Sequence, residues 1–330
     1  MKIIHQLLLV CILFTMSIHA QSIERQVVAS GGNTISNGTT TLDFTVGELV
    51  VTTITDGTTT LTQGFQQGGI KLGIEVNPIV FLQGALLDPN VGEENLMRDD
   101  LRVGSYIPST SPYGDGLMIQ SGVLAETGNN AIVDWVFVEL RDAMTNTTVI
   151  ASQSALLQRD GGVVGVDGMS DLKFNIPEGN YYVVVKHRNH LAIMTAATVA
   201  LSSTVEIVDF TNSNNQITFG SNAQTVFGMP NNIVAMWTGN VNADTIVQYS
   251  GTTPDTPSIL SEVLNDPGNF LNFPTYTISG YNMHDVNMDG NTQYTGTMPD
   301  TPFILQNVLS HPGNFLNFST FAIIEQLPEN

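Results

Sequence analysis

The sequence predicts a mainly β protein: a central antiparallel β-sandwich, a small β segment before it, and a small α module of two loop–helix repeats after it. Three observations carry this prediction. Short apolar strands are separated by Gly, Asn and Asp turn signals, and no helical crossover pattern lies between them. A stretch near the C-terminus also occurs twice at a constant offset. With 42% hydrophobic residues and 30 glycines, the chain has the composition of a packed, turn-rich protein.

The charge balance limits the partners that the chain can bind. Ten Lys and Arg face 30 Asp and Glu, which gives a formal net charge of −20 in a chain of 330 residues. Such a surface repels the phosphates of nucleic acids and anionic lipids, so we expect neither as a partner. No Lys or Arg follows Arg188, and the C-terminal part therefore offers an acidic surface suited to divalent cations.

Residues 1–20 have the pattern of a Sec-type signal peptide, with Lys2 ahead of an apolar run over 7–16. We therefore expect a secreted or cell-surface protein. No later segment approaches the roughly 20 apolar residues that a membrane-spanning helix needs. Cys11, the sole cysteine, lies inside this signal. The mature chain would then have no disulfides, and bound ions are a plausible replacement for them.

The stretch 21–73 is predicted to be an N-terminal β segment of a few antiparallel strands. It alternates Thr and Val with apolar residues and is interrupted by turn dipeptides. These dipeptides are Gly31-Gly32, Asn37-Gly38 and Asp56-Gly57.

Residues 74–225 are predicted to form the central domain. Apolar runs of strand length, separated by turn signals, are typical of an antiparallel β-sandwich of the immunoglobulin-like or prealbumin-like kind. The expected strands cover 79–85, 132–140, 148–157 and 181–187. The composition shifts after residue 225, where we place the start of the last domain, 226–330.

His187 and His190 are the most tempting catalytic candidates. Residues three apart on one strand point to opposite faces, and no Gly-x-Ser-x-Gly, His-Glu-x-x-His or Cys nucleophile accompanies them. We therefore expect the histidines to cap the sheet, and we name no catalytic residue. The alternative is an extracellular hydrolase or carbohydrate-active protein whose site combines both histidines with the irregular loop 88–116.

The repeat itself is well defined. Residues 241–273 align with 286–318 at an offset of 45, with 22 of the 33 positions identical. Each copy begins with a loop rich in carboxylates and amides and then enters a helix, for which Thr301 is the expected N-cap and Pro302 the first residue. A helix of about two turns cannot bury its apolar stripe alone, so we expect the copies to pack in pseudo-twofold fashion.

The second loop has the spacing of a calcium site, with oxygen-bearing side chains at positions 1, 3, 5 and 9 and Gly290 at the turning position. Gly296 occupies the twelfth position, where an acidic ligand is usual, so we expect Asp300 to take over that task. The predicted ligands are Asp285, Asn287, Asp289, the backbone carbonyl of Asn291, Gln293 and Asp300.

The first loop follows the same pattern less closely, because Asn240 replaces an aspartate and Thr245 replaces the turning glycine. Calcium is the cofactor we expect at both loops; the alternative is a pair of metal-free Asx-turns. The predicted ligands are Asn240, Asn242, Asp244, the carbonyl of Ile246, Gln248 and Asp255.

These duplicated loops, each leading into a short helix, resemble the type I dockerin repeat. Longer phrases resemble a family of secreted Bacteroidetes proteins often labelled hemagglutinin-like; they lie at 131–136, 155–161, 179–182 and 186–191. The resemblance implies a non-catalytic binding or cell-adhesion protein that contacts a protein or glycan on the cell surface or in the extracellular matrix. Dockerins bind cohesin domains through their helices, which here would place the contact at 258–264 and 303–309. The displaced acidic ligand departs from the dockerin pattern.

Overall fold

The computed structural model describes residues 32–36, 41–45, 54–55, 60–61 and 73–328. Contacts divide the chain into two compact units, Met1–Ile70 and Lys71–Asn330. The described part is mainly β, with antiparallel sheets and few helices. The expected signal peptide lies outside the described residues. The boundary expected between residues 225 and 226 lies inside the second unit.

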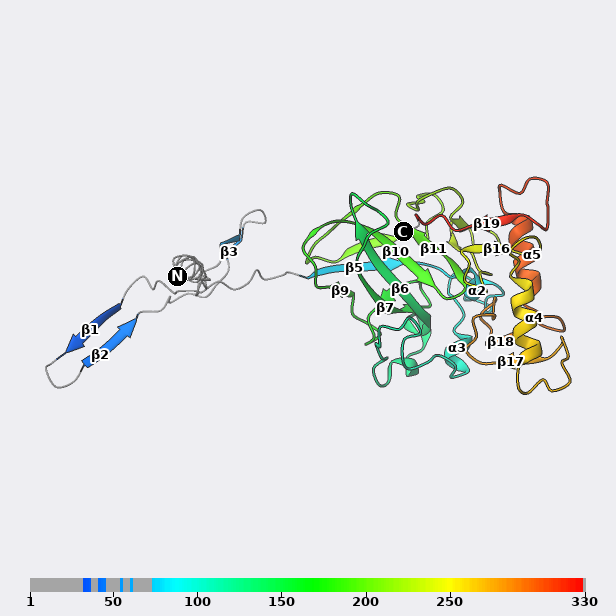
Figure 1. Ribbon diagram of the computed structural model, residues 1–330, viewed down its shortest axis with the longest axis horizontal. Coiled ribbons are helices and arrows are strands. Elements are labelled where there is room, and N and C mark those ends of the chain that lie inside the picture. The colour runs from blue at the N-terminus through cyan, green and yellow to red at the C-terminus, as the bar shows by residue number, and fades with distance from the viewer. Residues whose placement is uncertain (1–31, 37–40, 46–53, 56–59, 62–72, 329–330) are drawn as a thin grey trace, which may run out of the picture. The chain divides into compact units, whose positions relative to one another are not determined.

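The first unit contains two antiparallel strand pairs in its described residues (Figure 1). They are β1 (Gly32–Ser36) with β2 (Thr41–Thr45), and β3 (Ile54–Thr55) with β4 (Thr60–Leu61).

The largest sheet of the second unit has six strands, all paired antiparallel. Its longest strands, β6 and β7, form the centre, and nearly every side chain of β6 is buried because both of its faces are covered. The strands are β11 (His190–Met194), β10 (Gly179–His187), β6 (Ile132–Asp142), β7 (Val149–Gln158) and β8 (Val163–Val164) in spatial order, with β12 (Val199–Leu201) paired to β10.

A second sheet has the order β13 (Glu206–Asp209), β5 (Ile74–Ile79) and β9 (Leu172–Phe174). The β13–β5 pair is parallel, which the antiparallel prediction missed, because a long connection leaves strand direction open. The strand predicted over 79–85 is also wrong: β5 ends at Ile79, and a short helix, α2 (Gln83–Leu86), follows. Side chains from both sheets meet in one hydrophobic core that includes the fully buried Trp135.

The remaining short elements lie between β5 and β6 and between β13 and the C-terminal repeat. They are α3 (Asp100–Val103), the 3-10 turns η1 (Val123–Ala125) and η2 (Gly128–Asn130), and the paired strands β14 (Gln224–Thr225) and β15 (Ala235–Met236).

The repeat folds identically in both copies. The first copy gives β16 (Ile246–Gln248), α4 (Thr256–Asn265) and β17 (Thr277–Ser279); the second gives β18 (Asn291–Gln293), α5 (Thr301–Ser310) and β19 (Ala322–Ile324). Each helix begins one residue earlier than predicted, because Asp255 and Asp300 are the N-caps and the threonines are the first helical residues.

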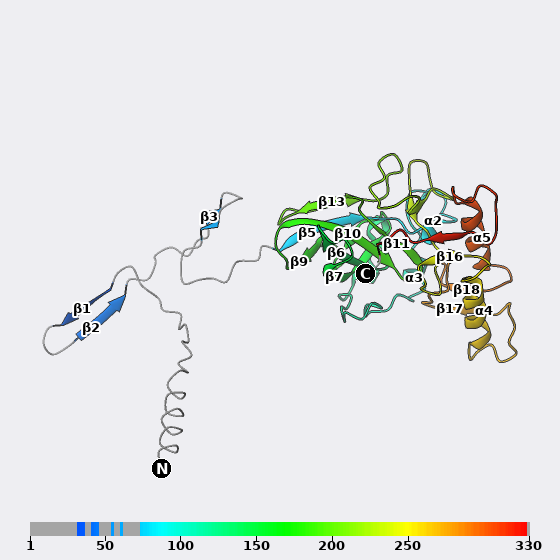
Figure 2. The ribbon, with the colours of Figure 1, turned by 45° about the horizontal axis from the view of Figure 1, so that its top comes forward.

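The copies exchange strands reciprocally, β16 pairing with β19 and β17 with β18. Matching registers in the two pairs relate the copies by a pseudo-twofold axis, as predicted. Their apolar side chains share a second core, which includes Ile259 and Val263 of α4 and Ile304 and Val308 of α5. Figures 1 and 2 show α4 and α5 in line along one end of the unit, each followed by a loop at the outer end. Among the described residues, none of the helices has the length and apolarity to cross a membrane.

Candidate metal centre

The second loop turns its alternate side chains inward, as a calcium loop requires. Asp285 accepts the Gly290 N–H on Oδ2 at 2.9 Å and the Asp289 N–H on Oδ1 at 3.1 Å. The Asp289 N–H also reaches Asn287 Oδ1 at 3.3 Å, and Asp289 Oδ1 accepts the Asn291 N–H at 2.8 Å. These are the bonds of successive Asx-turns. Because a carboxylate oxygen has two lone pairs, they leave acceptor capacity for a cation.

Asp300 closes this loop from the helix side, where the sequence predicts it. Its Oδ1 accepts the Val286 N–H at 2.7 Å and its Oδ2 accepts the Gln293 N–H at 2.8 Å. The side chain is thus fixed against the loop by two backbone donors, and the residue is 1% exposed. The N-cap of α5 is therefore also the clamp of the loop.

Burial and neighbouring negative charges make it costly to ionise the carboxyls of Asp285 and Asp300. Burial raises the pKa of Asp285 to about 7, an effect that Arg188 opposes and Asp289 reinforces. Burial, and then the charge of Asp285, raise the pKa of Asp300 well above its ordinary range. A bound cation would favour the ionised form of both carboxyls.

Three side chains from earlier in the sequence hold three consecutive carbonyls of the second loop. Asn189 Nδ2 donates to Asp285 O, Thr238 Oγ1 to Val286 O and an Arg98 nitrogen to Asn287 O, each at 2.6 Å. The ring of Tyr106 also lies where a side chain on Gly290 would project. The backbone of the second loop is therefore fixed by side chains that lie far from it in the sequence. Sequence reasoning missed these tethering residues because no local motif marks a donor to a distant carbonyl.

The first loop repeats the clamp. Asp255 accepts the Val241 N–H at 2.9 Å and the Gln248 N–H at 2.8 Å, and burial raises its pKa to about 7. Thr245 takes a φ of 67° where Gly290 has 84°, so the turn is the same although the residue is not glycine. Such a left-handed conformation is strained for a β-branched residue.

Asn240, at the first position of this loop, shows most clearly that the first loop suits a cation. It is 7% exposed, and its Oδ1 is a buried acceptor without a hydrogen-bond partner. A buried unpaired oxygen costs about 1–3 kcal/mol, and a cation would relieve that cost. Its neighbours Asn242 and Asp244 hold each other, Asn242 Nδ2 donating to Asp244 Oδ2 at 2.9 Å.

The side chains of Gln293 and Gln248 form hydrogen bonds with the other copy of the repeat. Gln293 Nε2 donates to Thr275 O and Thr277 Oγ1, both at 2.8 Å, and its Oε1 accepts the Met298 N–H. Gln248 likewise donates to Thr320 O at 2.9 Å. These side chains tie one copy to the other, and we leave both out of the proposed shell. Ile246 and Asn291, the expected carbonyl ligands, are the first residues of β16 and β18.

Within the described part of the chain, no three His, Cys, Asp or Glu side chains converge as a preformed metal centre. A calcium loop depends less on such a cluster, since amide and backbone carbonyl oxygens supply part of its shell. The remaining donors form two sets, one in each copy. They are Asp285, Asn287, Asp289, the Asn291 carbonyl and Asp300 in the second loop, and Asn240, Asn242, Asp244, the Ile246 carbonyl and Asp255 in the first.

The histidines meet, contrary to the prediction from their spacing. His187 ends β10 and His190 begins β11, so they pair across a tight turn on one face, and their Nδ1 atoms lie 2.9 Å apart. His187 Nε2 lies 3.0 Å from Asp134, and His190 Nε2 accepts the Gly84 N–H at 3.2 Å. Both rings are buried, at 6% and 2% exposed, so their nitrogens are committed to a closed network.

The irregular loop 88–116 uses its charges in ion pairs. Asp99 bonds Arg102 at 2.5 Å, and Asp99 also lies 3.7 Å from Arg159. These carboxylates are therefore held by structural ion pairs.

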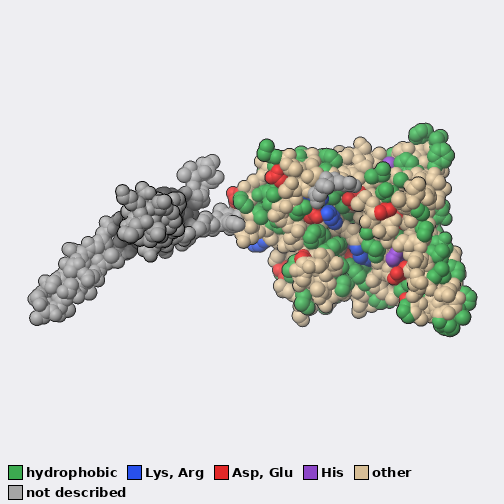
Figure 3. Space-filling view, viewed as in Figure 1, with side chains coloured by type: hydrophobic (Ala, Val, Ile, Leu, Met, Phe, Trp, Pro, Cys, Tyr) green, Lys and Arg blue, Asp and Glu red, His purple; other side chains and the backbone are tan. Residues whose placement is uncertain are grey.

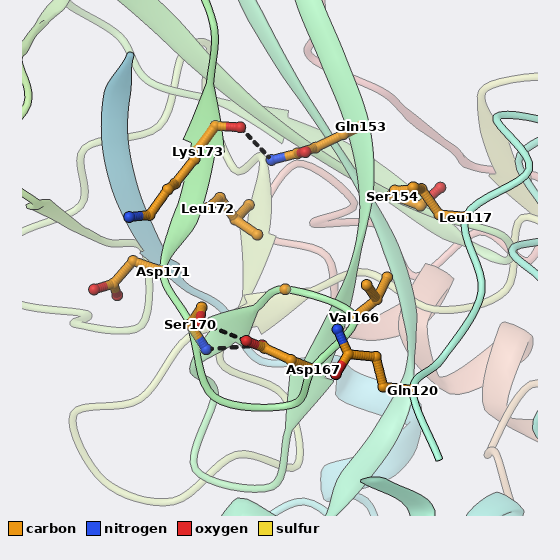
Figure 4. Close-up of a pocket in the computed structure, with 11 residues that line it drawn as sticks. Leu117, Gln120, Gln153, Ser154, Val166, Asp167, Ser170, Asp171, Leu172 and Lys173 are labelled. Carbon is orange, nitrogen blue, oxygen red and sulfur yellow. Dashed lines mark hydrogen bonds between the residues drawn. The ribbon is translucent and has the colours of Figure 1, made fainter. Parts of the chain in front are cut away.

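An open pocket of about 280 Å³ lies beside β7 and β9 (Figure 4). Its polar groups are largely bonded to one another: Asp167 accepts from Ser170 N at 2.9 Å, and Gln153 donates to Lys173 O at 3.3 Å. Figure 4 shows Asp171 and Lys173 directed away from the centre of the pocket. These hydrogen bonds stabilise the turn that lines the pocket, and we propose no ligand for it.

Comparisons of the chain with models of protein families, with curated proteins and with solved structures found no match.

Proposed function

We propose that this is a secreted or cell-surface, non-catalytic binding protein, with a β-sandwich central domain and a dockerin-like C-terminal module that calcium orders for docking. Two observations together support the proposal. Each loop has a buried carboxyl that backbone N–H groups hold in place, and the first loop also has the unpaired Oδ1 of Asn240. Arg188 offsets only part of the charge at Asp285, whose pKa burial still raises to about 7. A divalent cation bound by oxygen ligands would favour the ionised carboxyls and join each loop to the start of its helix.

Two apolar loops flank the helices and give the docking surface. In each copy the sequence Pro-Gly-Asn-Phe-Leu-Asn-Phe follows the helix, and its Phe and Leu side chains are 54% to 83% exposed. Figure 3 shows hydrophobic side chains gathered at this end of the unit. We call these six residues the apolar tips: Phe270, Leu271 and Phe273 in the first copy, and Phe315, Leu316 and Phe318 in the second.

The apolar tips are held in a fixed conformation. Asn269 is 3% exposed; its Nδ2 donates to Val263 O at 2.7 Å and to Phe273 O at 2.9 Å, and its Oδ1 accepts the Phe273 N–H at 2.8 Å. Asn314 makes the same three bonds in the second copy. A loop that is rigid while exposing large apolar side chains loses little conformational entropy on binding, which suits a protein partner with two equivalent apolar sites.

Calcium titration of the full chain tests the module. We expect binding by calorimetry, and a gain of about 3 kcal/mol in unfolding free energy at a calcium concentration 100 times the dissociation constant. Asp285→Asn and Asp289→Asn should weaken binding at the second loop, whereas the exposed Asp88→Asn should not. An unchanged melting temperature in calcium and in chelator would refute the metal assignment.

A pull-down from the cell envelope tests the docking surface. We expect capture of a protein partner in calcium, its loss in chelator, and its loss in the double variant Phe270→Ser with Phe315→Ser. The matched control is Val91→Ser with Met144→Ser, which removes two apolar residues elsewhere that are even more exposed. Equal capture by both double variants would remove the apolar tips from the proposal.

A further inference from the structure

The loops that carry the two apolar tips are identical in sequence, but the residue before each loop differs. Asp266 precedes the first loop and His311 the second, at equivalent positions of the repeat. Each residue is the C-cap of its helix. Each also accepts the N–H of the glycine two residues later, on Asp266 Oδ1 at 2.7 Å and on His311 Nδ1 at 3.0 Å. The same turn therefore presents a carboxylate in one copy and an imidazole in the other.

These two side chains have complementary hydrogen-bonding groups. Because His311 Nδ1 accepts a hydrogen bond, the neutral ring carries its hydrogen on Nε2, which is a donor. The Asp266 carboxylate has acceptors only, and its Oδ2 is left over when Oδ1 accepts the Gly268 N–H. Both side chains belong to partly exposed residues. Asp266 of one molecule can thus accept a hydrogen bond from His311 of another, whereas two aspartates or two histidines would not match.

The arrangement of the apolar tips fits a second copy of this chain. The helices α4 and α5 lie in line along one end of the unit, each followed by its tip at the outer end (Figures 1 and 2). A twofold axis perpendicular to this line places the first tip of one molecule on the second tip of the other, and the second on the first. Both contacts then bring Asp266 to His311. The chain itself is therefore a partner with two equivalent apolar sites.

The exposed apolar area is close to what such a contact needs. The six residues of the apolar tips are 54% to 83% exposed, and with roughly 180 Å² for a fully exposed Phe or Leu they present about 700 Å². A standard protein–protein interface buries about 800 Å² on each partner. The loops 267–273 and 312–318 contain no charged residue, which is typical of the centre of an interface.

We propose that the apolar tips join two copies of this chain in a twofold dimer, with the first tip of each molecule against the second tip of the other. This inference rests on the docking role proposed above and names the partner of that surface. Residues 226–330 contain nine Asp and Glu and no Lys or Arg, so two such modules repel each other. Two bound calcium ions would cancel four of these nine charges, and we therefore expect the dimer in calcium.

Sedimentation velocity of the full chain in calcium tests the dimer. We expect a dissociation constant on the order of 10 µM, and association at least about tenfold weaker in the double variant Phe270→Ser with Phe315→Ser. The control Val91→Ser with Met144→Ser should leave the dissociation constant unchanged. A chain that stays monomeric well above that concentration would overturn the proposal, as would a dimer that the tip variant leaves intact.

Exchange of Asp266 and His311 tests how the tips are paired. Asp266→His and His311→Asp each place like residues in both contacts, and each should weaken the dimer by about fivefold to tenfold. The double variant restores both pairs and should return the dissociation constant to within about twofold of its original value. The exchange keeps an acceptor for the glycine N–H in each turn. A double variant that associates no more tightly than the single variants would overturn this pairing.

Calorimetry with calcium on the same samples separates this inference from the calcium assignment. Calcium binding by a chain that stays monomeric would overturn the dimer and leave the apolar tips to a different protein, which the pull-down detects. Adsorption of the monomer to phosphatidylcholine vesicles, lost in Phe270→Ser with Phe315→Ser, would also overturn the dimer and assign the tips to a lipid surface.

Discussion

The two copies of the repeat share one hydrogen-bonding scheme but differ in their surroundings. In the second copy, Asn189, Thr238 and Arg98 hold three consecutive carbonyls, and Gly290 lies against Tyr106. In the first copy, Ala243 and Thr245 are exposed. The repeated sequence thus specifies the turn and its clamp, whereas the surroundings decide how tightly each loop is fixed.

The largest expected effect on stability comes from removing, one at a time and in calcium, the carboxyls of Asp300 and Asp255 that hold the two loops. Asp300→Ala leaves two buried N–H groups, those of Val286 and Gln293, without an acceptor, which we expect to cost about 2–6 kcal/mol of unfolding free energy. Asp255→Ala removes the same two bonds from the first copy. It should cost less, because the exposed first loop can shift and hydrate the freed donors. Denaturant titration of both variants measures the difference.

Asp266→Asn is the control for these variants, because Asp266 lies at the end of α4 and takes no part in either clamp. Equal losses for Asp300→Ala and Asp255→Ala would mean that the surroundings of the second loop contribute nothing to its fixation.

Much of this module is predictable from sequence because its determinants are local. The spacing of Asp285, Asn287 and Asp289 predicts the turn, and the displaced acidic position predicts Asp300. The glutamines at position 9 illustrate the limit. Spacing points Gln293 at the ion, but its amide bonds Thr275 and Thr277 of the other copy, a contact that exists only once the copies have exchanged strands.

Substitutions at the turning position of the two loops should change stability in opposite directions. Gly290→Ala should destabilise by about 1–3 kcal/mol, because a Cβ there would lie 2.8 Å from the Tyr106 ring at a φ that favours glycine. Thr245→Gly should stabilise the first loop by up to about 1 kcal/mol, because it releases the strain of a β-branched residue at φ 67°. Thermal unfolding of both variants in calcium measures each effect, and a loss of stability in Thr245→Gly would contradict the strain.

The histidines show why non-local sites escape sequence reasoning. A strand period applied to positions 187 and 190 assumes that both lie on one strand, whereas Arg188 and Asn189 form a turn between two. The same turn sends Asn189 to the second loop and lays Arg188 over the ring of Tyr281, whose hydroxyl bonds Asp134 at 2.7 Å. The polar network therefore joins the large sheet to the second loop.

The smallest expected effect is the titration of this network. Burial lowers the pKa of His187 and, with the charges of His187 and Arg188, lowers the pKa of His190 well below 6.5. An unfolded chain takes up protons near pH 6.5, so these histidines remove stability as the pH falls below that value. The raised pKa values of Asp255 and Asp285, about 7 each, act in the opposite direction in calcium-free protein, adding stability as the pH falls from 7 toward 3.8.

Because the two contributions oppose each other in one pH window, native-state NMR separates them better than a stability curve. We expect the imidazole Cε1–H resonances of His187 and His190, assigned with His187→Gln and His190→Gln, to stay at their neutral positions from about pH 7 to 5.5. A midpoint near 6.5 for either ring would show that water reaches the network, and the tether through Asn189 would then not be the rigid link between the sheet and the second loop.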